Sequence, residues 1–203
     1  MARQSFTWGA EPDNGDQFDV TSPLTLGVEF TASEAVPAIG TGFIVPGTLP
    51  TGPSPAYVSL WDSDDPVTPL AVGQFEWSDY TGMGGEYVEV DYDEPFDLAV
   101  GVEYRAAVQS FERFVNTLAW AFPFVDSGGI LTGLGGVLRY PEYGFPNLAA
   151  PGGANYFVTP VLLVDDPVEP DGAGPPSVSS TKGWLTSDST QLGPITSSTR
   201  RGP

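Results

Sequence analysis

The chain has 203 residues and a formal net charge of −19, and it contains neither cysteine nor histidine. Without these two residue types, thiol nucleophiles, serine–histidine triads and histidine- or thiolate-bound metal centres are excluded. A surface this negative repels nucleic acid and anionic membranes, so we expect neither as a partner.

Short runs of alternating apolar and polar residues between positions 20 and 164 predict β-strands. The 25 glycines and 21 prolines favour turns between strands over helices. In chain order, the predicted strands cover residues 23–31, 38–45, 57–62, 72–78, 86–92, 103–110 and 155–164. Residues 111–124 have room for a helical turn or two, which Pro123 limits. The series predicts an all-β domain at 20–164, an antiparallel β-sandwich or jelly roll.

The predicted strand at 86–92 and the residue after it carry three carboxylates on one face, opposite an apolar face: Glu89, Asp91 and Asp93 against Val88, Val90 and Tyr92. Neighbouring carboxylates in such a row lie about 7 Å apart and repel by only about 0.6 kcal/mol in water. Solvation alone therefore explains the row, with a surface for a basic partner or a metal site as alternatives. Arg105 would lie opposite the row if strands 86–92 and 103–109 formed a hairpin.

Two loops, at 13–19 and 61–66, are rich in the oxygen ligands that calcium prefers. Neither has the glycine and distal glutamate of an EF-hand, and aspartate and proline suit turns for backbone reasons alone. We expect no metal and no cofactor. No pair of carboxylates is singled out for glycoside hydrolysis, so we also expect no enzymatic activity.

The composition changes after Val164, since 23 of the 39 residues in 165–203 are proline, glycine, serine or threonine. This predicts an extended C-terminal arm without its own core, and residues 1–19 are predicted to be an N-terminal arm. From Gly172 onward the chain has three bases and one acid, whereas residues 1–171 have 25 acids and four bases. We expect both terminal arms to dock on neighbouring subunits, an undocked surface tail being the alternative for the C-terminal arm. Its candidate anchors are its large apolar and basic side chains: Trp184, Leu185, Leu192, Ile195, Lys182, Arg200 and Arg201.

Residues from about Leu26 to Leu163 resemble a β-sandwich domain that recurs in secreted bacterial multidomain proteins and in virion proteins of actinobacterial phages. The motifs that carry the resemblance are Leu60-Trp61-Asp62, the turn and strand from Pro95 to Tyr104, and Asn155-Tyr156. The family often has an aspartate where this chain has Thr159. The resemblance implies a sandwich fold and an accessory role beside carbohydrate or surface-associated proteins, and it supplies no catalytic residues.

The sequence opens without the apolar stretch of a signal peptide, and it has no apolar run of membrane-spanning length. We therefore expect synthesis in a host cytoplasm and display on the exterior of a virus particle. The leading hypothesis is a non-enzymatic capsid-decoration or minor tail protein that contacts other capsid or tail subunits and forms a homo-oligomer. The alternative is a carbohydrate-binding module that engages a bacterial surface glycan through Trp77 and Tyr80 in an exposed loop.

Overall fold

The structure is a computed structural model that describes residues 2–5, 17–19, 22–46, 56–77, 80, 85–110, 113–115, 122–126 and 128–165. All of them belong to the first of two compact units, Met1–Pro167. Apart from Asp165, the predicted C-terminal arm lies outside the described residues.

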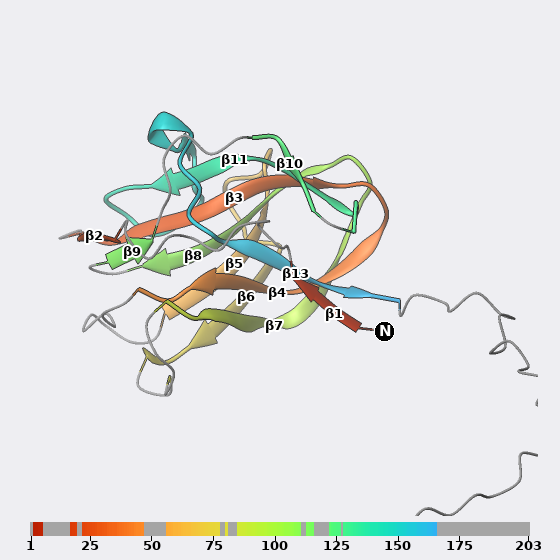
Figure 1. The fold of residues 1–203 in the computed structure, drawn as a ribbon, viewed down its shortest axis with the longest axis horizontal. Coiled ribbons are helices and arrows are strands. Elements are labelled where there is room, and N and C mark those ends of the chain that lie inside the picture. Colours follow the sequence, from red (N-terminus) through yellow and green to blue (C-terminus); the bar gives the residue numbers. More distant parts are fainter. Residues whose placement is uncertain are drawn as a thin grey trace, which may run out of the picture. The chain divides into compact units, whose positions relative to one another are not determined.

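Two antiparallel sheets pack face to face and form a β-sandwich (Figure 1). The smaller sheet has the strand order β1 (Ala2–Ser5), β13 (Thr159–Val164), β4 (Val36–Ile44) and β7 (Tyr87–Leu98). The larger sheet has the order β10 (Phe124–Val125), β11 (Leu131–Arg139), β3 (Leu24–Ala32), β8 (Glu103–Ser110), β5 (Ala56–Asp62) and β6 (Ala71–Phe75), and β12 (Leu148–Ala149) pairs with β11. A separate pair is formed by β2 (Gln17–Asp19) and β9 (Arg113–Val115), and a short 3-10 helix, η2, covers Pro151–Gly153. The predicted all-β sandwich is confirmed.

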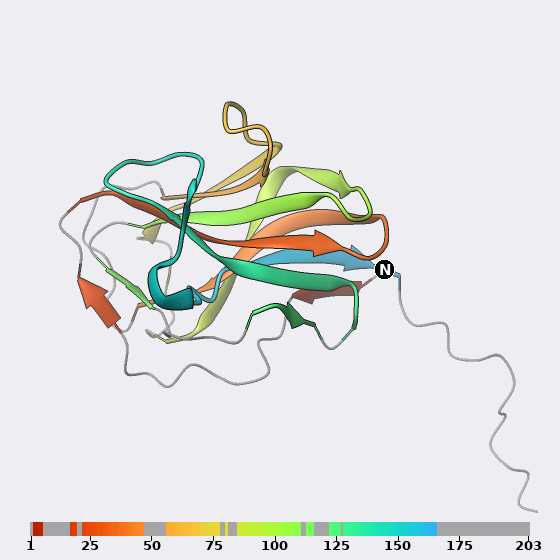
Figure 2. The same ribbon diagram turned by 90° about the horizontal axis from the view of Figure 1, so that it is seen from above.

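The alternation of β3 and β8 explains their central place in the larger sheet. Val28 and Phe30 are buried in the sandwich, and they lie opposite Ala106 and Tyr104 of β8 in the register of the two strands. The residues between them face outward, so that Glu29 lies opposite Arg105. Figure 2 shows β3 running beside β8 on one side and β11 on the other.

Strand β11 is not among the predicted strands, because glycines interrupt its alternation. Gly133, Gly135 and Gly136 leave a run with few large side chains and no clear period of two. The register with β3 also shifts between Gly133 and Gly135. Gly136 is required for packing, since a Cβ there would collide with the carbonyl oxygen of Ala154.

The N-terminal residues differ from the predicted arm at 1–19. Residues Ala2–Ser5 form β1, which pairs with β13 so that Arg3 lies opposite Leu163. This pairing supplies hydrogen-bond partners to the backbone groups along that side of β13, which gives the segment a physical reason to join the sheet. Residues 6–16 lie outside the described residues.

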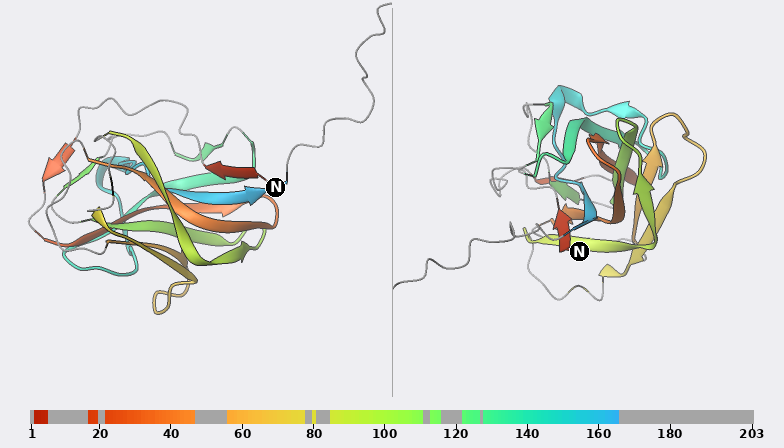
Figure 3. Two further views of the ribbon diagram at one scale, coloured as in Figure 1. Left: turned by 90° about the horizontal axis from the view of Figure 1, so that it is seen from below. Right: turned by 90° about the vertical axis from the view of Figure 1, so that its right-hand side faces the viewer.

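Strand β7 is twelve residues long and bends out of the regular ladder of the smaller sheet (Figure 3). Gly40 of β4 lies opposite Asp91, whereas Ala38, two residues earlier, lies opposite Phe96. Near Asp91 the backbone of β7 comes very close to both β4 and β6. A Cβ on Gly40 or on Gly73 of β6 would collide with backbone carbonyl oxygens of β7. Glycine at these two positions therefore lets β7 lie between its neighbours.

We predict that Gly73→Ala destabilises the sandwich, because the new Cβ collides with the carbonyl oxygen of Asp91. The expected loss in the free energy of unfolding is about 1–3 kcal/mol, the usual cost of overpacking. The matched control is Gly135→Ala in β11, where a Cβ meets no atom within 4 Å. Urea unfolding of both variants tests this, and equal stability of the two would contradict the close approach of β6 and β7.

Tyr92 is a polar residue on the buried face of β7. Its hydroxyl and that of Thr41 share a buried hydrogen bond of 2.6 Å. Burial raises the pKa of Tyr92 well above its ordinary value, because the phenolate would lose its hydration, and the bond to Thr41 offsets only part of this rise. Burial likewise raises the pKa of Tyr156 to about 12.

We predict that the protein loses stability at alkaline pH. Because the pKa of Tyr92 and that of Tyr156 are raised by folding, the unfolded chain releases these protons first. This contribution to the free energy of unfolding is complete below pH about 10 and falls as the pH rises toward the folded-state pKa values. Tyr92→Phe should lower stability at neutral pH and flatten the alkaline decline. Urea unfolding across this range is the measurement, and an equally steep decline in the variant would disprove the assignment.

Candidate functional site

The acidic row predicted on β7 faces outward, as the alternation requires. Val90 and Tyr92 are buried, whereas Asp91 and Asp93 are exposed and Glu89 is half-buried. We call Glu89, Asp91 and Asp93 the acidic row. Two further acids near the end of the strand, Glu94 and Asp97, are also exposed, so β7 presents a strongly negative strip to solvent.

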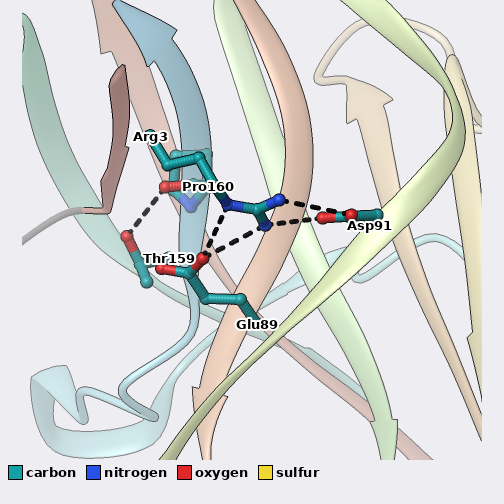
Figure 4. Close-up of polar contacts among 5 residues, drawn as sticks. All are labelled: Arg3, Glu89, Asp91, Thr159 and Pro160. Carbon is teal, nitrogen blue, oxygen red and sulfur yellow. Dashed lines mark hydrogen bonds and ion pairs between the residues drawn. The ribbon is translucent and has the colours of Figure 1, made fainter.

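Arg3 of β1 extends over the outer face of the smaller sheet to the acidic row (Figure 4). Its Nη2 donates to Asp91 Oδ1 at 2.6 Å and its Nη1 to Asp91 Oδ2 at 3.2 Å. Its Nε donates to Glu89 Oε2, also at 3.2 Å. One guanidinium therefore binds two members of the row, in the forked geometry that arginine favours with carboxylates.

Glycines on β4 explain how Arg3 reaches so far. Strands β13 and β4 lie between β1 and β7, and on β4 the residues opposite Asp91 and Glu89 are Gly40 and Gly42. Because these glycines have no side chains, no β4 side chain at these two positions lies between Arg3 and the two carboxylates. The aromatic ring of Tyr87 occupies the space above Gly42, where a Cβ would collide with it.

The Arg3 ion pairs contribute little to stability. The accessible fractions of the Arg3 and Asp91 side chains are 45 % and 63 %, so water and salt screen the pair to at most about 1 kcal/mol. The hydrogen bond to Asp91 raises the pKa of the Arg3 guanidinium, which therefore stays charged. The pairing shows that the row accepts a basic side chain, and it leaves Asp93 exposed beside it.

The hypothesis that Arg105 lies opposite the acidic row is wrong. Strand β7 pairs with β4 in the smaller sheet, and β8 pairs with β3 and β5 in the larger one. The two strands are consecutive, but residues 99–102 lead from one sheet to the other, so no hairpin forms. Arg105 instead binds Glu29, with Nη2 at 2.7 Å and Nε at 2.9 Å from the same carboxylate oxygen.

Arg105 also anchors the 140–147 loop on the outer face of the larger sheet. Its Nη1 donates to the carbonyl oxygen of Pro146 at 2.6 Å, and its guanidinium carbon lies 4.6 Å from the ring centre of Phe145. Phe145 packs edge-to-face on Trp61 of β5, with ring centres 5.7 Å apart. The backbone nitrogen of Gly144 donates to the Thr25 hydroxyl at 3.1 Å. Side chains of three neighbouring strands, β3, β8 and β5, therefore hold this loop on the sheet.

The residues predicted for glycan binding lie in different environments. Trp77 is only 8 % exposed and packs edge-to-face on Phe43 and Phe75 in the core. The expectation that Trp77 faces solvent is therefore wrong, because the end of β6 turns this ring inward. Tyr80 is half-buried, and its hydroxyl donates to Glu86 at 2.9 Å.

The predicted arm anchors, residues 182–201, lie outside the described residues, as does most of the acidic loop at 13–19. In the loop at 61–66, carboxylates complete turns: Asp62 accepts the backbone N–H of Asp64, and Asp65 that of Val67. Over the ranges that the structure describes, no cluster of three or more Asp, Glu, His or Cys residues is arranged to hold a metal ion. In the same ranges, no helix is long and apolar enough to span a membrane.

Thr159 is the residue at which the predicted resemblance would place an aspartate. It is fully buried at the start of β13, and its hydroxyl donates to the carbonyl oxygen of Pro160 at 3.2 Å (Figure 4). An ionised carboxylate at such a position would be costly without a partner. Comparison of the chain with models of known protein families and with curated proteins found no match. The family resemblance therefore stays a prediction.

We predict that Arg105→Met lowers the free energy of unfolding by about 1–3 kcal/mol, because Glu29 and the Pro146 carbonyl lose a largely buried charged donor. Arg139→Met is the matched control, since its pair with Glu142 is exposed and contributes less than about 1 kcal/mol. Amide hydrogen exchange at Gly144 should accelerate in the first variant only. Equal stability and exchange in both variants would show that Arg105 does not anchor the loop.

Proposed function

We propose that this chain is a structural or accessory protein of a bacteriophage particle, either a capsid-decoration or a minor tail protein. In this proposal it catalyses no reaction and serves on the particle exterior. It docks on capsid or tail subunits, or on copies of itself, and the docking segment is the C-terminal arm with the anchors Trp184, Leu185, Leu192, Ile195, Lys182, Arg200 and Arg201.

The observation that carries the proposal is the separation of charge between the two parts of the chain. The sandwich presents four exposed acids along β7, namely Asp91, Asp93, Glu94 and Asp97. The sequence from Gly172 onward has three bases and one acid. Opposite charges on two surfaces accelerate their encounter and fix their relative register. The part of the arm from Gly172 onward, which has more bases than acids, is therefore complementary to the negative strip on β7 of a neighbouring subunit.

The pairing of Arg3 with the acidic row supports this use of the strip. A guanidinium on β1 already binds Asp91 and Glu89 of the same chain, so the row has room for a basic side chain. Exposed pairs of this type add little affinity, and apolar anchors such as Trp184 and Leu185 would supply most of it. The N-terminal arm has a smaller part in the proposal, because Ala2–Ser5 is paired within its own sheet.

The alternative function, a carbohydrate-binding module that uses Trp77 and Tyr80, is less well supported. Sugar rings stack on exposed aromatic faces, and Trp77 is buried among Phe43 and Phe75. We therefore do not favour a glycan platform at these two residues.

We predict that deletion of residues 172–203 lowers the occupancy of the protein on purified phage particles, because the arm supplies the apolar and basic anchors. Quantitative mass spectrometry of particles assembled with either form measures the occupancy. A second variant, Lys182→Gln/Arg200→Gln/Arg201→Gln, keeps the length of the arm and removes its charge. Its binding should be weaker than that of the full chain and should depend less on salt.

The control is Asp65→Asn, which removes an acid from an exposed turn that is not part of β7 and should leave occupancy unchanged. Unchanged occupancy after deletion of the arm would refute the role of the arm. Absence of the polypeptide from purified particles would refute the proposed function as a whole.

A further inference from the structure

A pocket of about 260 Å³ lies on the outer face of the larger sheet, over β5, β6 and β8. The side-chain pattern of β5 explains the hollow. Tyr57, Ser59 and Trp61 alternate on one face of the strand, so a small residue lies between two aromatic ones. Its volume is below the roughly 300–1,000 Å³ of sites for drug-sized ligands, which suits a ligand of about one ring.

The lining of this pocket is uncharged, although the chain has 26 acidic and seven basic residues. Its side chains are aromatic, aliphatic or neutral polar ones, and the charged pair Arg105–Glu29 lies beside it rather than in its lining. A charged ligand would therefore find no counter-charge in the lining. The pocket selects for a neutral ligand with a substantial apolar surface.

Two partly exposed tyrosines line the pocket. Tyr57 on β5 and Tyr143 in the 140–147 loop are each 38 % exposed, and Val72 of β6 beside them is 39 % exposed. Clustering of half-exposed apolar side chains around one hollow is typical of a binding site rather than of scattered surface residues. The apolar C–H face of a sugar ring packs well on such aromatic rings.

Neutral polar groups also line the pocket. The Gln109 side chain of β8 carries both a carbonyl acceptor and an amide donor, which match the hydroxyl groups of a sugar. Ser59 accepts a hydrogen bond of 2.8 Å from Trp61 Nε1, which leaves its own O–H able to donate. An apolar face flanked by donors and acceptors is the combination that a pyranose ring presents to a protein.

The residues that line the pocket are held in place before any ligand binds. Tyr57 and Ser59 belong to β5, which is paired on both sides. Tyr143 precedes Gly144 and Phe145, which are held by Thr25 and Trp61, and the loop is bound further along through Pro146 and Arg105. A site held in this way loses little conformational entropy when a ligand binds.

We infer that this pocket binds one neutral pyranose unit of a glycan, stacked between Tyr57 and Tyr143 and hydrogen-bonded by Gln109. This goes beyond the proposed function, because it involves neither the arm nor the acidic row. It also differs from the sugar platform predicted at Trp77 and Tyr80.

The test uses the full chain and a panel of methyl pyranosides: glucoside, galactoside, mannoside and N-acetylglucosaminide. Saturation-transfer NMR and backbone chemical-shift titration measure binding. At least one of these sugars should bind and shift the amides of residues 57–59, 109 and 143–144. Tyr57→Ala and Tyr143→Ala should each weaken binding at least about fivefold, the low end of what removal of an aromatic stacking contact to a nucleic-acid base costs. Gln109→Ala should weaken binding as well.

The matched control is Tyr140→Ala, because Tyr140 is 51 % exposed and belongs to the same loop but does not line the pocket. It should bind the sugar as the unaltered chain does, and thermal unfolding should show that all variants fold. The inference is overturned if no sugar of the panel binds, or if Tyr57→Ala and Tyr143→Ala bind as well as Tyr140→Ala. It is also overturned if the same amides respond only to a proline-rich peptide or to increasing protein concentration. None of these results depends on the arm, so they do not affect the occupancy test.

Discussion

The close passage of β7 between β4 and β6 is the constraint on which the rest of the sandwich depends. A backbone can approach two neighbours so closely only where side chains are missing, and Gly40 and Gly73 provide these gaps. With β7 held there, Val90 and Tyr92 fill the interior while Glu89 and Asp91 face solvent. The position of one strand thus sets both the packing of the core and the location of the acidic row.

The arginines of the sandwich show how few positive charges organise a very acidic surface. Residues 1–171 have four bases against 25 acids. Three of these bases, Arg3, Arg105 and Arg139, each pair with a carboxylate. Arg3 and Arg139 lie in exposed pairs, where solvent reduces the interaction, and Arg105 lies in a more enclosed one that also fixes a loop. Of these three, Arg105 is therefore the one whose contacts determine local structure.

Local patterns in the sequence were sufficient to predict the sandwich and the faces of its regular strands. The alternation of residues 86–92 and 103–110 placed the correct side chains inward, because burial of one face selects a period of two. Such a pattern does not determine which strands pair with each other. The same alternation suits pairing of β7 with β8 or with β4, and only the assembled sheets decide that Arg105 binds Glu29 and that Arg3 reaches Asp91. Strand β11 was not predicted, because its glycines interrupt the alternation. The pocket that Tyr57 lines could not be predicted either, because the 140–147 loop, which is far from Tyr57 in the sequence, forms part of it.

The short strand β1 has a consequence for association of the protein with itself. An exposed strand edge invites pairing with another chain, and proteins limit this by keeping edge strands short and charged. On one side of the smaller sheet β6 approaches β7 closely. On the other side, the outermost described strand is the four-residue β1, which carries a charged arginine. The close approach of β6 at one edge and the short, charged β1 at the other both discourage edge-to-edge pairing of sheets into fibrils. Contacts between copies should therefore form through side-chain surfaces instead.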